Sequence, residues 1–220
     1  MTFHIITLFP QSFDSYLGES IIKRAVEDKK IKIKFYDPKD FAALAARQEK
    51  GKIKRVDDKP YGGGPGMVVR ALPTINAIAK AISKSKNKKA KIIFLSPGGK
   101  QFTNKYAEGV AKNYSDIIIV SGRYEGIDAR VKKVFKMEDI SIGPFVLTGG
   151  ELPAMIIIDS ISRQVSGVLG NRESIEELRE ASASVYTRPE KFTYKGKTYK
   201  VPKILLSGHR EKIENWRKKH

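Results

Sequence analysis

Four segments of the chain combine glycine with polar or charged residues in a pattern that favours ligand binding. They span residues 61–66, 96–100, 122–128 and 142–153. Glycine permits positive φ angles and lets the backbone approach a ligand closely. No segment ends in the Gly-Lys-Ser/Thr of a P-loop, and none reads Gly-x-Gly-x-x-Gly after a strand, so neither nucleotide-binding motif is expected. Each segment alone is typical of a tight turn, but together they predict the walls of one pocket.

The elements that must position these segments follow from hydrophobic periodicity. Strands are predicted at 3–9, 31–36, 92–95 and 117–120, and helices within 13–26, 71–82, 106–110 and 152–165. This alternation predicts the α/β class, with a parallel sheet covered by helices on both faces. Ligands bind to such sheets outside the carboxyl ends of the strands. Segments 61–66, 96–100 and 122–128 are each predicted to follow a strand, the last two directly after strands 92–95 and 117–120.

The composition indicates a basic protein with a polyanionic partner. Among 220 residues, 42 are Lys or Arg and 24 are Asp or Glu, which gives a net charge of +18. Neutralised phosphates release counterions, so this excess favours nucleic acid; the alternative is a Lys-rich proteome encoded by an AT-rich genome. The chain has no Cys, and His4, His209 and His220 are too scattered to predict a zinc site. Without a membrane span or signal peptide, a soluble cytoplasmic protein is expected.

The composition also changes along the chain. Residues 1–170 carry the strand and helix alternation and form the predicted first domain. Residues 171–184 are acidic and poor in apolar side chains, which predicts a linker or a flap. Residues 185–220 are basic with interleaved Tyr, Phe and Trp, and we interpret them as a second, small helical element.

Six sequence blocks carry a resemblance to a known family. They are DDKPYGGGPGM, SGRYEGID, SIGPFVLTGGELPAM, GVLG, YTRPE and LLSGHREKIENWR. In this order, and over nearly the whole chain, they resemble the bacterial tRNA (guanine-37-N1)-methyltransferase family. The resemblance implies the SPOUT fold, with a deep trefoil knot within about 92–165, and a homodimer whose active site is shared between subunits. It also implies methyl transfer from S-adenosylmethionine to N1 of guanosine 37 beside the anticodon, which supports reading-frame maintenance.

The resemblance assigns the methyl donor to the glycine-rich segments. Residues 142–147, 149 and 150 are implied to contact the adenine through backbone groups. The complete implied donor set is Pro97, Gly122, Tyr124, Glu125, Gly126, Ile142, Gly143, Pro144, Phe145, Val146, Leu147, Gly149 and Gly150. One departure lies in this set: Pro144 and Phe145 replace the family's usual Asp-Tyr pair, and Pro144 has no backbone N–H.

The catalytic residues implied by the resemblance are Arg163 and a carboxylate of the following segment. Guanine N1 is protonated at neutral pH, so a general base must remove its proton, and a cation can stabilise the charge that moves to O6. The family's usual acidic position is occupied here by Leu178. Glu177 is the preferred candidate for the base, with Glu180 and Glu176 as alternatives. These glutamates could also simply solvate a short helix.

The remaining implied contacts involve the tRNA. Asp58 lies in the DDKPYGGGPGM block and is implied to recognise guanosine, since a carboxylate accepts hydrogen bonds from the N1–H and amino edge. Arg188 and His209 are candidates for tRNA binding in the basic C-terminal element. Mg²⁺ dependence is a family expectation, although the sequence contains no dedicated metal cage.

Two other functions stay open at this point. The first is a knotted methyltransferase acting on ribose 2′-OH or on ribosomal RNA, for which Asp58 has no role. The second is a non-catalytic RNA-binding protein that retains the fold but has lost the base, as the altered segment around Leu178 would allow.

Overall fold

The computed structural model describes residues 1–49, 55–86, 90–169 and 184–219. The chain divides into two compact units, Met1–Gly170 and Asn171–His220.

The first unit is built on a five-stranded sheet, in which all neighbouring strands are parallel. The strands follow the order β2-β1-β6-β5-β7. Their bounds are Thr2–Ile6 for β1, Lys32–Tyr36 for β2, Lys91–Gln101 for β5, Asp116–Val120 for β6 and Glu138–Ser141 for β7. The central strand β6 reads Asp-Ile-Ile-Ile-Val and is buried along its whole length, as expected for a parallel strand covered on both faces.

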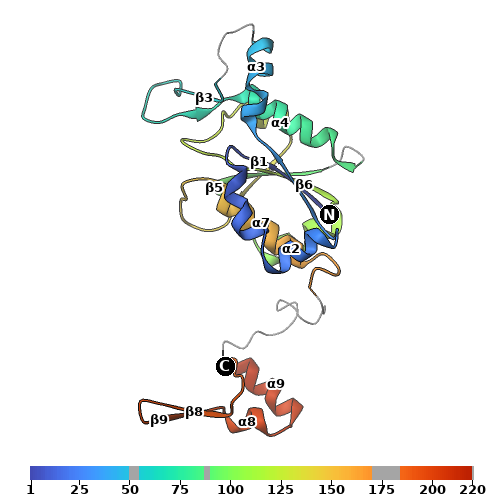
Figure 1. Ribbon diagram of the computed structural model, residues 1–220. Coiled ribbons are helices and arrows are strands. Elements are labelled where there is room, and N and C mark those ends of the chain that lie inside the picture. The colour runs from blue at the N-terminus through green and yellow to red at the C-terminus, as the bar shows by residue number, and fades with distance from the viewer. Residues whose placement is uncertain (50–54, 87–89, 170–183, 220) are drawn as a thin grey trace. The chain divides into compact units, whose positions relative to one another are not determined.

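Helices cover both faces of this sheet (Figure 1). On one face, α4 (Ala71–Ser83) packs its alanines and Ile78 against Ile6, Ile118 and Val120. On the other face lie α1 (Asp14–Leu17), α2 (Ser20–Glu27), α5 (Asn104–Asn113) and α7 (Glu151–Arg163). The shorter elements of this unit are η1 (Pro10–Phe13), η2 (Pro38–Phe41), α3 (Ala42–Gln48) and α6 (Val131–Val134). The predicted α/β class is therefore confirmed.

Three local predictions were wrong in detail. The helix predicted within 13–26 is interrupted between α1 and α2, where Ser20 has a φ of +52°. Strand β5 does not end at Leu95 but continues through the glycine segment to Gln101, with a register shift between Leu95 and Lys100. The segment 61–66 follows no strand of the sheet; it forms the turn of a separate hairpin, β3 (Asp57–Asp58) and β4 (Val68–Val69).

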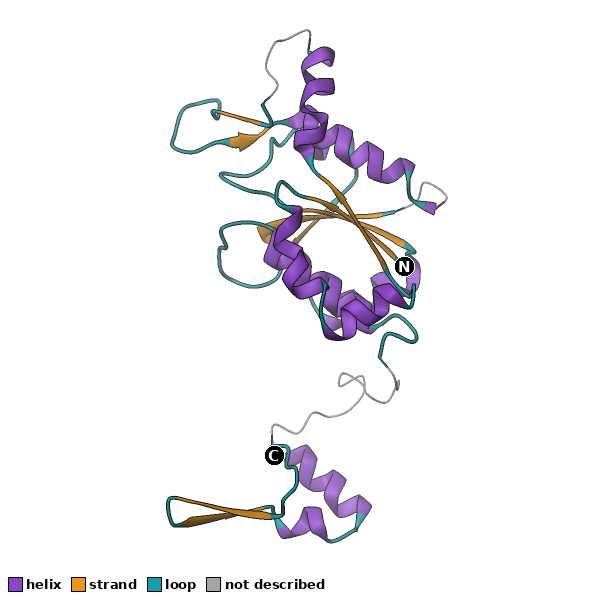
Figure 2. Ribbon diagram, in the orientation of Figure 1, coloured by secondary structure: helices purple, strands orange, loops and turns teal. Residues whose placement is uncertain are grey.

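The second unit contains more than the helices expected from the sequence. An antiparallel hairpin of β8 (Lys191–Tyr194) and β9 (Lys197–Lys200) precedes α8 (Lys203–Leu206) and α9 (Arg210–Lys219), as Figure 2 shows. The rings of Phe192 and Tyr199 stack across the hairpin, 5.4 Å apart. Across both units, no helix among the described residues is long and apolar enough to cross a membrane.

Candidate functional site

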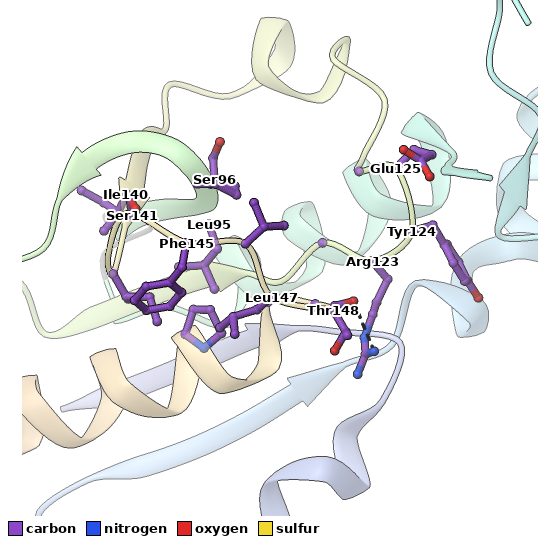
Figure 3. Close-up of a pocket in the computed structure, with 18 residues that line it drawn as sticks. Leu95, Ser96, Arg123, Tyr124, Glu125, Ile140, Ser141, Phe145, Leu147 and Thr148 are labelled. Carbon is purple, nitrogen blue, oxygen red and sulfur yellow. Dashed lines mark hydrogen bonds between the residues drawn. The ribbon is translucent and has the colours of Figure 1, made fainter. Parts of the chain in front are cut away.

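A cavity of about 320 Å³ opens in the first unit where the loops that follow β6 and β7 meet residues 95–97 of β5. Figure 3 shows Ile140, Ser141 and Phe145 at one end of the site and Tyr124 and Glu125 at the other. The complete lining is Leu95, Ser96, Pro97, Gly122, Arg123, Tyr124, Glu125, Gly126, Ile140, Ser141, Ile142, Phe145, Val146, Leu147, Thr148, Gly149, Gly150 and Pro153. Its size and its mixture of apolar walls with a few polar groups are typical of a small-molecule site.

The loop after β6 is held in an uncommon backbone conformation. Tyr124 has a φ of +59°, which costs a residue other than glycine on the order of 1 kcal/mol. The loop is fixed from both sides: Gly126 N donates to Arg123 O (3.0 Å), and Glu125 N donates to Met67 O (3.0 Å). A strained, well-anchored turn of this kind is characteristic of a binding site.

The hairpin turn at 61–66 supports this loop but does not line the cavity. Gly66 has a φ of +82°, and a Cβ on it would lie 2.6 Å from Glu125 Oε1. The glycine therefore lets the hairpin pack directly against the Glu125 side chain. The prediction that segment 61–66 forms part of the pocket wall was wrong. This segment packs against Glu125, which lines the cavity, and does not line the cavity itself.

The segment after β7 returns to the end of β6. Gly150 N donates to Gly122 O (2.9 Å), and a Cβ on Gly150 would stand 2.7 Å from Ser121 Cα. At the other end of the segment, the absent side chain of Gly143 leaves space for the Phe145 ring. Backbone therefore packs on backbone at one end and on an aromatic ring at the other, which fixes the path of residues 143–150.

A cluster of ionic and hydrogen-bonding contacts joins the amino ends of β5 and β7. Glu138 Oε2 accepts from Lys91 Nζ (2.5 Å) and from the Tyr106 hydroxyl (2.9 Å). Burial opposes the charge on Glu138, but these two hydrogen bonds outweigh it and lower its pKa. Burial and the bond to Glu138 raise the pKa of Tyr106. Between the same strands, a Cβ on Gly99 would lie 2.6 Å from the Asp139 carbonyl carbon, so β5 can pass β7 closely only at a glycine.

Most residues expected to bind the donor are brought together by this cavity. All of them line it except Gly143 and Pro144, which lie within the same segment. The lining also includes residues for which no role was predicted: Leu95, Ser96, Arg123, Ile140, Ser141, Thr148 and Pro153. Each lies within three residues of a predicted donor position, so the sequence motifs located this part of the site.

The other expected site residues lie elsewhere. Glu177 and Glu180 fall outside the described residues. Arg163 ends α7 and does not line the cavity, and neither does Asp58 on β3, which is exposed and accepts from Lys59 N (2.8 Å). Arg188 and His209 are exposed and belong to the second unit. Within the described part of the chain, no three His, Cys, Asp or Glu side chains gather as a metal site.

The fold and the cavity define the class: a parallel α/β protein with a ligand pocket beyond the carboxyl ends of neighbouring strands. A family model described as tRNA (Guanine-1)-methyltransferase TrmD matches residues 1–220. The chain therefore belongs to the tRNA (guanine-1)-methyltransferase family, which confirms the resemblance inferred from the sequence blocks.

Individual relatives support this placement. A tRNA (guanine-N(1)-)-methyltransferase of Clostridioides difficile (strain 630) is 43% identical, over 99% of this chain and 91% of that protein. The protein of the same description from Clostridium perfringens (strain ATCC 13124) is 46% identical, over 100% of this chain and 87% of that protein. The crystal structure of tRNA (m1G37) methyltransferase from Aquifex aeolicus matches with a TM-score of 0.76 and 35% identity, covering 100% of this chain and 88% of that one.

Proposed function

We propose that the chain transfers a methyl group from S-adenosylmethionine to N1 of guanosine 37 in tRNA, and so supports reading-frame maintenance in the cytoplasm, where tRNA is used. The observation that carries this proposal is the convergence of segments 95–97, 122–126 and 140–150 on one cavity. The Aquifex relative, described as a tRNA (m1G37) methyltransferase, supports the choice of position 37.

The cavity fits a ligand of this chemistry. S-adenosylmethionine combines an adenine, a ribose and a cationic amino-acid portion, and it supplies an electrophilic methyl group when bound. Apolar side chains such as Ile140, Phe145 and Leu147 suit the flat adenine, while the glycines of the returning segment leave backbone groups accessible to its edge. The carboxylate of Glu125 suits the cationic portion.

The reaction needs two further groups from this chain. A carboxylate must take the N1 proton of guanine, and we assign this role to Glu177, with Glu180 as the alternative. Arg163 then stabilises the negative charge that develops on guanine O6. We assign guanosine recognition to Asp58, because its exposed carboxylate can accept from the base edge.

The face of α7 that carries Arg163 supports a homodimer with a shared active site. Leu152 and Ile156, four residues apart on α7, are 56% and 48% exposed although both are large and apolar. Asp159 and Arg163 continue this row toward the end of the helix at intervals of three and four residues. A second copy packed on this face would bury the apolar pair and receive Arg163 near its own pocket.

The same proposal includes a trefoil knot in the first unit and tRNA binding by the second unit. The return of segment 142–150 from β7 to Gly122 supports the knot, because it brings two segments of the range 92–165 into contact. The basic hairpin and helices of the second unit, with Arg188 and His209, are assigned to the phosphates of the anticodon stem-loop. Mg²⁺, if required, would act with the RNA or donor, since the described residues offer no cage for it.

One assay tests the proposal directly. The full-length enzyme is incubated with methyl-labelled S-adenosylmethionine and undermodified tRNA, and the modified nucleoside is located by mass spectrometry. Label on N1 of guanosine 37 is expected. Label on a ribose or on ribosomal RNA would support the alternative methyltransferase, and tRNA binding without any label would support the non-catalytic RNA-binding protein.

Two variants test the assigned roles. Arg163→Ala should lower kcat by about 100-fold, because an interaction made in the transition state is lost. Asp58→Ala should lower turnover of the guanosine substrate while the Kd for S-adenosylmethionine stays unchanged. Wild-type turnover in either variant would contradict its assignment.

A further inference from the structure

A buried carboxylate lies directly behind the pocket wall. Glu151 is the first residue of α7, and only 3% of its surface is exposed. Its Oε1 accepts from the Thr7 hydroxyl (2.8 Å), and its Oε2 lies 2.8 Å from Arg123 Nε. The N–H of Arg123 does not point along the hydrogen-bond direction, so attraction between the two charges joins them.

Arg123 lines the cavity and therefore connects Glu151 to it. Its guanidinium stands over the Phe9 ring, 4.6 Å from the centroid, and its Nη1 lies 3.5 Å from Thr148 O, at the outer limit of a hydrogen bond. Figure 3 shows the side chain extending toward Thr148. A side chain on Gly149 would collide with Arg123 and Glu151, so glycine is required there for this arrangement.

Three loops meet at this carboxylate. Thr7 and Phe9 follow β1, Arg123 follows β6, and Gly149 closes the segment that follows β7. Thr7 also accepts from Phe9 N through its hydroxyl (3.0 Å), which ties the first loop to the same group. A buried charge is tolerated only when partners surround it, so a displacement of any one loop would leave Glu151 poorly compensated. The three loops are therefore coupled.

We propose that Glu151 is a positioning residue for the donor site: through Arg123 and Thr7 it fixes the loops after β1, β6 and β7 in the arrangement that binds the donor. This inference rests on the proposed function, because it takes the cavity to be the S-adenosylmethionine site. Glu151 does not line the cavity, and it acts through Arg123, Thr148 and Gly149, which do.

The test separates donor and tRNA kinetics in the full-length enzyme. Glu151→Gln keeps the size of the side chain and an acceptor for Thr7, but it removes the charge that holds Arg123. The KM for S-adenosylmethionine should rise about tenfold while the KM for tRNA stays unchanged, as expected for one lost charged contact. Thr7→Val, a milder change, should raise the donor KM in the same direction, and Thr7→Ser should restore it.

Asp116→Asn is the matched control. Asp116 is also buried (2% exposed) and also accepts from a hydroxyl, but it starts β6, and its hydrogen-bond partners His4, Lys86 and Ser115 do not line the pocket. The Asp116→Asn substitution should lower the Tm of the enzyme and leave its KM for S-adenosylmethionine unchanged. The inference is overturned if the donor KM rises equally in Asp116→Asn, or if it does not rise in Glu151→Gln and Thr7→Val. Either result would leave the proposed function standing. If the wild-type enzyme does not bind S-adenosylmethionine by calorimetry, the proposed function fails and the inference fails with it.

Discussion

Among the described residues of the first unit, two buried carboxylates lie at opposite ends of β6: Asp116 begins the strand, and Glu151, the first residue of α7, lies beyond its carboxyl end. Asp116 accepts from His4 Nε2 (3.0 Å), from the Ser115 hydroxyl (2.8 Å) and from Lys86 N (3.2 Å). Glu151 has one well-directed donor and one charged neighbour whose N–H is misaligned. The two carboxylates share burial but differ in how completely their surroundings satisfy them.

The difference separates a stabilising network from a positioning one. An ionised carboxylate can only accept hydrogen bonds, so His4 Nε2 donates to Asp116. His4 Nδ1 then accepts a hydrogen bond from the Tyr36 hydroxyl (2.9 Å). This network is closed within the core, and it contributes to stability. The contacts of Glu151 end on Arg123 at the surface of a cavity, where small displacements change the shape of a binding site.

The largest effect is expected at the pocket end, from Gly150→Val. A Cβ at this position would lie 2.7 Å from Ser121 Cα and 3.0 Å from Gly122 N, so backbone must move and the returning segment is displaced. Binding of S-adenosylmethionine, measured by titration calorimetry, should weaken about 100-fold. Gly109→Ala is the control: this helical glycine has nothing near its Cβ position, and the change should stabilise α5 by up to about 1 kcal/mol. Donor binding within threefold of wild type in Gly150→Val would contradict the prediction.

The next effect is expected at the amino end, from His4→Phe. The ring keeps its approximate size, but Asp116 loses its principal donor and stays buried. The free energy of unfolding, measured by urea denaturation at pH 7, should fall by about 3 kcal/mol, as for other buried pairs that lose one partner. The Kd for S-adenosylmethionine of the folded variant should not change. A loss below about 0.5 kcal/mol would show that the network does not stabilise the fold.

The sequence predicted the class of fold because its strongest signals are local. The buried run of β6 and the periodicity of α7 require no knowledge of distant partners. The continuation of β5 past Leu95 was not predictable, because glycines normally end a strand, and this one continues only by packing Gly99 against β7. The hairpin that contains Asp58 was also missed, since its strands have only two residues each.

The site was predictable where motifs cover it and not where distant residues meet. The segments 122–126 and 142–150 were identified as blocks, and the cavity joins them. The contact between Thr7 and Glu151 spans 144 positions of sequence, and a lone threonine after a strand carries no signal of its partner. The buried pairing of His4 with Asp116 was missed for the same reason, although His4 is the only histidine of the first unit.

A third prediction concerns the pH dependence of the same amino-end network. Burial lowers the pKa of His4 despite its bond to Asp116, and hydrogen bonds from His4 and Ser115 outweigh burial to lower the pKa of Asp116. The unfolded chain therefore binds more protons than the folded one on acidification. The contribution of His4 is complete above its unfolded pKa of about 6.5 and declines below it, whereas that of Asp116 declines only below about 3.9. Urea denaturation between pH 7 and pH 4 should show stability falling more steeply in the wild type than in His4→Phe; parallel curves would contradict this assignment.

The smallest effect is expected from an exposed carboxylate, which isolates burial as the deciding variable. Asp139 Oδ2 pairs with Lys132 Nζ at 2.5 Å, closer than either buried carboxylate lies to its partners, but the two side chains are 40% and 36% exposed. Water screens this pair and solvates either charge left alone, so Asp139→Asn should change the free energy of unfolding by less than about 1 kcal/mol. Lys132 keeps its place over the Phe94 ring, 4.1 Å from the centroid, which limits the change further. Urea denaturation of Asp139→Asn and His4→Phe under the same conditions compares the two losses of unfolding free energy directly. A loss in Asp139→Asn as large as that in His4→Phe would mean that the short distance, and not burial, determines how much each carboxylate contributes.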